Sequence, residues 1–147
     1  MGLDKTDLAI LRILEKTARL SFRKVAKKTG VSVATVLNRI SKLEKEKVIT
    51  GYTVILDKEK LGCDLQAITS IIVSKGKLFE VEKKIASHPS VMAVYDVTGS
   101  FDVVVISTFR SRKAMDSFLK KIQTYDFVQK TETVIVLNTI KEDFFRV

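Results

Sequence analysis

Four side chains rich in hydrogen-bonding groups recur at helical spacing in the first third of the chain. They lie at offsets 0, 3, 4 and 7, on one face of a helix: Thr35, Asn38, Arg39 and Lys42. Amide and guanidinium groups suit the base edges of DNA, and hydroxyl and ammonium groups suit its phosphates. We therefore expect Asn38 and Arg39 to read bases, and Thr35 and Lys42 to hold phosphates. The alternative is a solvated helix face that carries ordinary surface cations.

A helix predicted over residues 32–46 positions these side chains. Ser32 is a suitable N-cap, because its hydroxyl can accept a hydrogen bond from the first turn. An apolar stripe follows, which we expect to be buried: Val36, Leu37, Ile40 and Leu43. The first turn of a recognition helix lies against base edges. Ser32, Val33 and Ala34 therefore join the expected DNA-binding set.

A short cationic helix is predicted before this one. Ser21 is its N-cap candidate, and Gly30 falls where a helix ends with positive φ. Two helices joined by such a turn form a helix-turn-helix, whose first helix contacts the DNA backbone. We therefore expect Ser21, Arg23 and Lys24 to contact phosphates.

The distribution of charge agrees with a polyanionic partner for the first half. The net charge is +9, and residues 1–60 hold 14 basic and 7 acidic residues, against 12 and 10 in residues 61–147. A first helix is predicted from Asp4, its N-cap, to Lys16. Strand-forming residues from Val48 to Ile55 surround Thr50-Gly51 and predict a β-hairpin. Three helices and a hairpin make a winged helix-turn-helix, which either binds DNA or makes protein contacts.

The second half contains an internal repeat with a shift of 37 residues, in which Lys83-Lys84-Ile85 matches Lys120-Lys121-Ile122. Strands are expected over 66–73, 91–97, 101–108 and 128–137, and helices over 77–87 and 111–123. This βαββαβ order is the ferredoxin-like fold, so the fold class is α+β. The strands are apolar on both faces, although helices cover only one face. We therefore expect the second face to pair with another copy of the chain, the alternative being a monomer.

The turn between the two repeats runs from Thr98 to Asp102. Free N–H groups near Gly99 suit a carboxylate, and the carboxylate of Asp102 suits an ammonium group. A zwitterionic amino acid would satisfy both. The alternative is a common Gly-Ser turn that Asp102 caps.

Several classes of function are disfavoured by composition. Cys63 and His88 are the only residues of their types, which excludes an intramolecular disulfide and a cysteine-rich zinc site. With no phosphate-binding loop and no metal-ligand spacing, we expect neither an enzyme nor a cofactor. The N-terminus lacks the apolar core of a signal peptide, and no apolar run is long enough to span a bilayer. We therefore expect a cytoplasmic protein without a membrane partner.

The order of the parts and their motif residues resemble the Lrp/AsnC family, also called feast/famine regulators. The resemblance covers nearly the whole chain and rests on LDKTDLAIL, on residues 21–53, and on VTGSFDVVV followed by TETVIVLNTIK. It implies a homodimeric transcription regulator with a RAM-type amino-acid-sensing domain, whose dimers assemble into octamers. It also implies an effector site at the turn between the second and third strands and on the last strand: Thr98, Gly99, Ser100, Phe101, Asp102, Thr131 and Thr133.

Two positions depart from the family pattern. The family often has glycine after the recognition helix, where this chain has Lys47, so we expect the helix to end differently. Ser100 stands where many relatives carry a larger polar or acidic residue, so the identity of the effector does not transfer.

The sequence therefore predicts a sequence-specific DNA-binding transcription regulator whose assembly and DNA binding respond to a free amino acid. Its expected parts are a winged helix-turn-helix over 1–56, a linker over 57–65 and a ferredoxin-like dimerisation and sensing domain over 66–147. The main alternative is an architectural, chromatin-like protein that coats DNA without a small-molecule switch. An enzyme of amino-acid metabolism with a ferredoxin-like regulatory domain is a third class, for which we find no catalytic residues.

Overall fold

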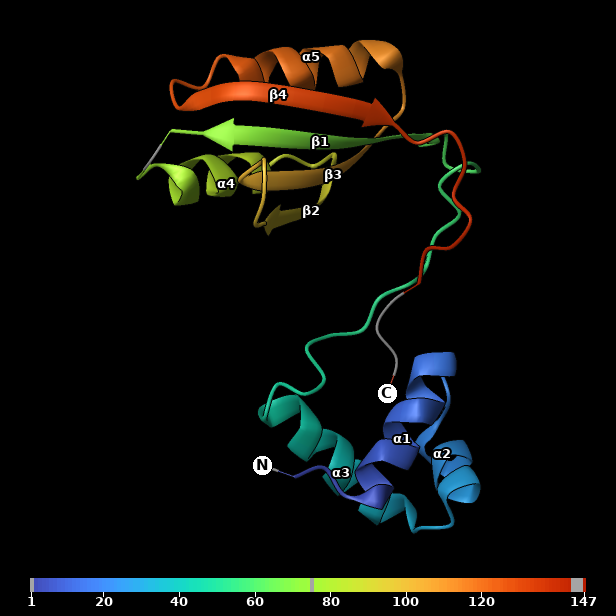
Figure 1. Cartoon of the computed structure of the whole chain (residues 1–147). Coiled ribbons are helices and arrows are strands. Elements are labelled where there is room, and N and C mark those ends of the chain that lie inside the picture. Colours follow the sequence, from blue (N-terminus) through green and yellow to red (C-terminus); the bar gives the residue numbers. More distant parts are fainter. Residues whose placement is uncertain (1, 75, 144–146) are drawn as a thin grey trace. The chain divides into compact units, whose positions relative to one another are not determined.

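The computed structural model describes residues 2–74, 76–143 and 147. The chain divides into two compact units (Figure 1). Unit 1 comprises residues 1–55 together with 141–147, and unit 2 comprises residues 56–140. Residues 141–143 and Val147 therefore group with the N-terminal helices. No helix in the described part of the chain is both long and apolar enough to cross a membrane.

Unit 1 is built from three helices, α1 (Lys5–Lys16), α2 (Phe22–Thr29) and α3 (Val33–Lys45). They share a small core in which all three helices take part: Ile10, Leu14, Val25, Ala26, Val36 and Ile40. Asp4 begins α1 with a capping box, in which its side chain accepts the N–H of Asp7 and the side chain of Asp7 accepts the N–H of Asp4. The predicted start of α1 is confirmed.

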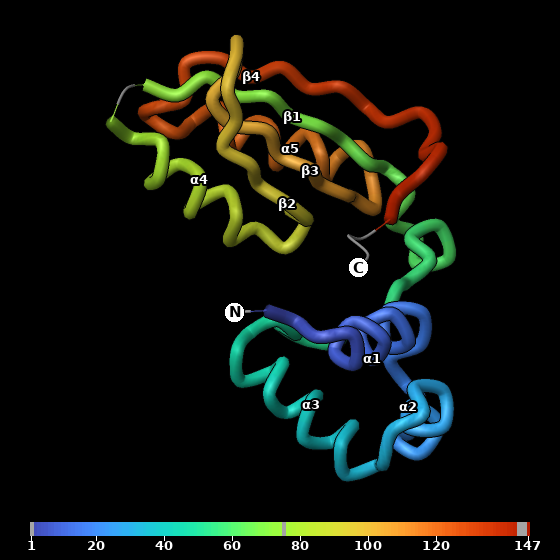
Figure 2. The backbone as a smooth tube through the Cα atoms, turned by 60° about the horizontal axis from the view of Figure 1, so that its bottom comes forward, coloured from blue at the N-terminus to red at the C-terminus, as the bar shows by residue number. Residues whose placement is uncertain are grey.

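A tight turn joins α2 to α3, as the tube of Figure 2 shows. Gly30 ends α2 in the left-handed conformation with φ 74°, and Ser32 begins α3 by accepting the N–H of Thr35 at 3.0 Å. Ser21 caps α2 by accepting the N–H of Lys24 at 3.4 Å. These local hydrogen bonds confirm the predicted helix-turn-helix.

The end of α3 differs from the prediction. Lys47 adopts φ 54°, the left-handed conformation that glycine adopts without steric cost, so the helix ends as it would with glycine at this position. The N–H groups of Val48 and Ile49 both donate to the carbonyl of Leu43, at 2.9 and 3.1 Å. These bonds occupy a free carbonyl of the last turn and hold Lys47 in place.

The predicted hairpin of the wing is wrong for the described chain. Residues 51–57 form no strand, and Val54 and Ile55 are 69% and 81% exposed. Two strands of three or four residues are marginal without a further strand or a helix against them. Tyr52 instead turns back to α3 and donates its hydroxyl to Glu44 at 2.9 Å.

Unit 2 contains the four strands and two helices that the internal repeat predicts. In chain order they are β1 (Leu65–Val73), α4 (Leu78–Ala86), β2 (Val91–Asp96), β3 (Val103–Phe109), α5 (Arg112–Gln123) and β4 (Val128–Ile135). The sheet is antiparallel throughout, with the order β2-β3-β1-β4 (Figure 1). The predicted ferredoxin-like fold is confirmed.

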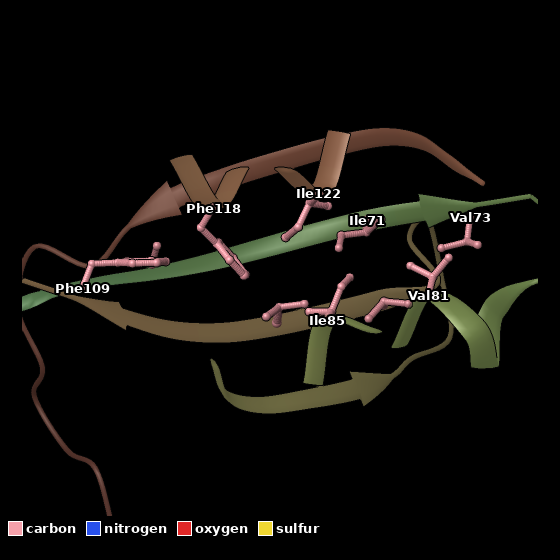
Figure 3. Close-up of a cluster of buried hydrophobic side chains, with 10 residues drawn as sticks. Ile71, Val73, Val81, Ile85, Phe109, Phe118 and Ile122 are labelled. Carbon is pink, nitrogen blue, oxygen red and sulfur yellow. The ribbon is translucent and has the colours of Figure 1, made fainter. Parts of the chain in front are cut away.

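One face of the sheet carries the core of unit 2. Val81 and Ile85 of α4, and Phe118 and Ile122 of α5, pack against strands β1 and β3 (Figure 3). From Gln66 to Val73 half-buried and buried residues alternate, and Ala67, Thr69, Ile71 and Val73 are the buried ones. The alternate residues of β1 lie on the opposite face, which no helix of the described chain covers.

Candidate functional site

The solvent-facing side of α3 is rotated from the face that the sequence predicts. The exposed residues of α3 are Val33, Ala34, Leu37, Asn38, Ser41, Lys42, Glu44 and Lys45. Leu37, which we expected in the buried stripe, is 44% exposed. Thr35 and Arg39, which we expected beside Asn38 in the DNA-facing stripe, are half-buried. The side of α3 opposite Val36 and Ile40 is therefore part aliphatic and part polar.

The hydroxyl groups at the start of α3 are occupied by the cap. Ser32 Oγ accepts the N–H of Thr35 at 3.0 Å and lies 2.9 Å from Thr35 Oγ1. This pair fixes the first turn of the helix and shares a hydroxyl proton. The expected phosphate contact of Thr35 would have to use its remaining hydrogen-bonding capacity.

Arg39 pairs with the first turn of α1. Its Nη1 donates to Asp4 and to Asp7, the latter at 3.2 Å, and the Asp7 side chain is only 4% exposed. The hydrogen bond from Asp7 N–H, together with the guanidinium, lowers the pKa of Asp4. The hydrogen bond to Asp4 and its charge raise the pKa of Arg39. We call these three residues the Asp4–Asp7–Arg39 clamp, and its guanidinium is directed at α1.

The cations of α2 are arranged as the sequence predicts. Arg23, Lys24, Lys27 and Lys28 are all exposed, and Ser21 is exposed at the start of the same helix. Within residues 2–74, 76–143 and 147 none of these cations forms an ion pair, so their charges face solvent. A helix that presents several free cations beside a recognition helix can neutralise phosphates along a DNA strand.

The predicted effector turn is attached to the end of β1. Asp102 Oδ2 accepts the N–H of Val73 at 2.8 Å, and the N–H of Asp102 donates to the carbonyl of Ile71 at 3.0 Å. Gly99 has φ 119°, a conformation open to glycine, which explains its place in the turn. One oxygen of Asp102 therefore fixes the turn, which is the structural role expected as the alternative to ligand binding.

The two predicted threonines of β4 lie on the helix-covered face of the sheet. Thr133 pairs with Thr69 in the strand register, and their hydroxyls are 3.1 Å apart. Thr131 accepts a hydrogen bond from Gln123 Nε2 at 3.1 Å. The ammonium of Lys130 lies 5.6 Å from the centroid of the Phe101 ring.

A pocket of about 270 Å³ opens beside β4 and the end of α5. Gln123, Val128, Gln129, Lys130 and Thr131 line it. Of the predicted effector residues, only Thr131 belongs to this lining, while Phe101 reaches the same strand through Lys130. The structure therefore brings the turn and β4 together at one end of the sheet without joining them in one enclosed cavity. No group of three metal-ligating side chains occurs in the part of the chain that the structure describes.

The sequence did not predict four residues near the DNA-binding helix and the pocket at β4. They are Asp4 and Asp7, which pair with Arg39, and Gln123 and Lys130, which line the pocket. The spacing of Asp4 and Asp7 marks a helix start, but their contact with a residue more than thirty positions away leaves no local pattern. Gln123 and Lys130 lie outside the family motifs, so nothing in the resemblance pointed to them.

Known protein families match both the helix-turn-helix of unit 1 and the sheet of unit 2. Residues 66–144 match the Lrp/AsnC ligand binding domain, and residues 3–50 match a winged helix-turn-helix DNA-binding domain. An uncharacterised HTH-type transcriptional regulator of Pyrococcus furiosus is 47% identical, over 98% of this chain and 97% of its own. The regulatory protein AsnC of Haemophilus influenzae is 35% identical, over 97% of both chains.

Solved structures show the same fold. AsnC of E. coli superposes with a TM-score of 0.91 at 31% identity and covers 99% of both chains. A transcriptional regulator of Neisseria meningitidis in complex with L-methionine has a TM-score of 0.89 at 26% identity, over 97% of this chain and 94% of its own.

Proposed function

The chain belongs to the Lrp/AsnC family of transcription regulators, and we propose on that premise that it binds specific double-stranded DNA sites through α3. The observation that carries this proposal is the helix-turn-helix of unit 1, in which the exposed cations of α2 precede the exposed face of α3. In this geometry the second helix enters the major groove and the first contacts the backbone.

The cations of α2 give the proposal a direct test. Lys24→Ala should weaken binding to operator and random DNA alike and reduce the salt slope by about 0.9, the value for one lost phosphate contact. Lys84→Ala, a lysine on α4 of unit 2, is the control and should leave the slope unchanged. Affinities measured by fluorescence anisotropy between 50 and 200 mM salt would give both slopes. An unchanged slope for Lys24→Ala would remove this residue from the DNA interface.

We also propose that the uncovered face of the sheet pairs with a second copy of the chain. The support is the run of half-buried and exposed apolar side chains across its strands: Ile68, Ile72, Tyr95, Val104, Ile106 and Val134. A symmetric dimer covers this face with the same surface and presents two copies of α3 to a pseudo-palindromic site. Assembly of such dimers into octamers follows from the family resemblance and is part of the same proposal.

The third part of the proposal is a free amino acid as effector, bound near the Thr98–Asp102 turn and β4. Two observations support it: the match of residues 66–144 to a ligand-binding domain, and the L-methionine complex of the N. meningitidis regulator. The effector would act by binding one assembly state more tightly than another, and so shift the number of DNA-binding units held together.

A second candidate function is supported by the engagement of Asp102 with Val73 N–H. Because that contact already occupies one oxygen, the turn is stable without a ligand. The chain would then be an architectural protein that coats DNA without a small-molecule switch.

A thermal-shift screen of the twenty amino acids separates the two candidates. A ligand that binds only the folded state stabilises it by about 2.7 kcal/mol when its concentration is 100 times its Kd. This stabilisation gives a measurable rise in the thermal midpoint. Asp102→Asn keeps an acceptor for Val73 N–H and removes the charge, so it should abolish the shift without loss of folding. If no amino acid shifts the midpoint, and binding also ignores the DNA sequence, the result favours the architectural function.

A further inference from the structure

The first two turns of α3 expose an aliphatic patch. Val33 and Leu37 are 38% and 44% exposed and lie one turn apart on the helix, and Ala34 is exposed beside them. Single exposed apolar side chains are ordinary on protein surfaces. Three in one patch, on the part of a helix that would enter the major groove, suit an apolar group on the DNA.

The major groove offers one such group, the C5-methyl of thymine, and aliphatic side chains contact it. The neighbouring exposed side chain is Asn38. Its amide can accept a hydrogen bond from adenine N6 and donate one to adenine N7. Both kinds of contact select the same base pair, since thymine and adenine are partners.

The group best suited to guanine is directed elsewhere. Arg39 is the only cation between residues 33 and 39, and its guanidinium is held by Asp4 and Asp7. Arginine bound bidentately to guanine is the commonest specific contact in the major groove, and this part of α3 has no free arginine to make it. The exposed cations of α2 supply backbone contacts that do not depend on sequence.

From these three observations we propose that the first two turns of α3 select A·T base pairs, with Val33 and Leu37 contacting thymine methyl groups and Asn38 contacting adenine. The inference rests on the proposed DNA-binding function and names the determinant of its specificity. The occupant of the aliphatic patch is therefore the major groove of an A·T-containing half-site.

The test begins with selection of binding sites for the full-length protein from a random 30-base-pair duplex library. The selected duplex is then synthesised with uracil in place of thymine at single positions, which removes only the C5-methyl group and leaves base pairing intact. We expect A·T pairs in each half-site, and a loss of affinity of about fourfold for each contacted methyl.

The double variant Val33→Ala, Leu37→Ala identifies the side chains responsible. Alanine favours helix, so the variant should retain the circular dichroism spectrum of the parent. It should bind thymine and uracil duplexes equally, whereas the parent protein separates them. Leu61→Ala is the matched control, since Leu61 is 49% exposed in the turn before β1 and its loss should leave the thymine preference intact.

Four results would overturn the inference. Equal affinity of the parent protein for thymine and uracil duplexes would exclude methyl contacts. A double variant that keeps the thymine preference would assign those contacts to other residues. G·C pairs at the selected positions would show that another group reads the bases. A selection that enriches no sequence at all would refute the sequence-specific function itself, and this inference with it.

Discussion

Replacement of Asp7 by alanine tests whether the Asp4–Asp7–Arg39 clamp positions the recognition helix. The side chain of Asp7 is 4% exposed. It accepts a hydrogen bond from Asp4 N–H at 3.1 Å, and both of its oxygens accept from Arg39 Nη1, at 3.2 and 3.4 Å. Loss of a helix cap costs about 1 kcal/mol. A charge-assisted hydrogen bond contributes about 1.5 kcal/mol or more, and we take the low value because Arg39 remains one third exposed. The greater helix propensity of alanine recovers a few tenths.

We therefore expect Asp7→Ala to lower the free energy of unfolding by about 2 kcal/mol. Urea unfolding of the full chain, followed by circular dichroism, measures this difference, provided that the transition of unit 1 is separated from that of unit 2. Asp7→Asn is the matched variant, because its amide oxygen can still accept Asp4 N–H while the ion pair is lost. It should destabilise unit 1 less than Asp7→Ala does.

The same variants distinguish the two roles of Arg39. If the clamp positions α3, then Asp7→Ala and Arg39→Ala each weaken binding to all DNA sequences. The loss of binding energy in the double variant is then smaller than the sum of the two single losses. If Arg39 reads a base, Arg39→Ala relaxes the preference at one base pair by roughly 5- to 150-fold, and Asp7→Ala does not. A change in folding energy below about 0.5 kcal/mol for Asp7→Ala would refute the clamp, since surface substitutions without structural roles fall in that range.

Three further predictions concern residues whose backbone or protonation is perturbed. Lys47→Gly should stabilise unit 1 by about 0.5–1 kcal/mol in urea unfolding, because glycine adopts φ 54° without steric cost. Burial raises the pKa of Glu82, and its Oε1 has no hydrogen-bond partner within the described residues. The stability that the neutral Glu82 carboxyl contributes is therefore present below pH 4.5 and is lost as pH rises through the raised pKa. Glu82→Gln should therefore raise the thermal midpoint slightly at pH 7 and leave it unchanged at pH 4. The pKa of Asp4 is lowered by Asp7 N–H and by Arg39, so its stabilisation holds above pH 3.8 and is lost as pH falls through the lowered pKa. Asp4→Asn, which retains a cap, should flatten the decline of the thermal midpoint between pH 4 and pH 2.

Local sequence patterns were sufficient to predict the helices and strands. Ser21, Ser32 and Gly30 act at the ends of helices through hydrogen bonds that span three or four residues, so their roles can be read from spacing alone. In unit 2 the internal repeat of 37 residues predicts the same order of strand, helix and strand in each of its two copies. Short-range hydrogen bonds and repeated patterns therefore account for the part of the fold that the sequence predicted.

The predictions that failed depend on contacts between distant residues. Residues 48–55 have the composition of strands, but strand composition needs a partner strand, and the described chain provides none. The placement of Leu37 in the buried stripe came from a helical wheel, which cannot tell which side of α3 meets α1 and α2. Lys47 was expected to change the end of its helix, yet the two bonds to Leu43 retain the left-handed conformation.

The clamp also explains how one helix can carry both a structural cation and a reading face. Arg39 and Asn38 are adjacent, so their side chains leave α3 about 100° apart. The guanidinium turns to the buried carboxylate of Asp7, and the amide turns to solvent. Because the two carboxylates of the clamp exceed its one guanidinium, freeing Arg39 for DNA would leave a buried negative charge unpaired near phosphates. The arrangement therefore favours base reading by the exposed side of α3, while Arg39 holds α3 in its orientation against α1.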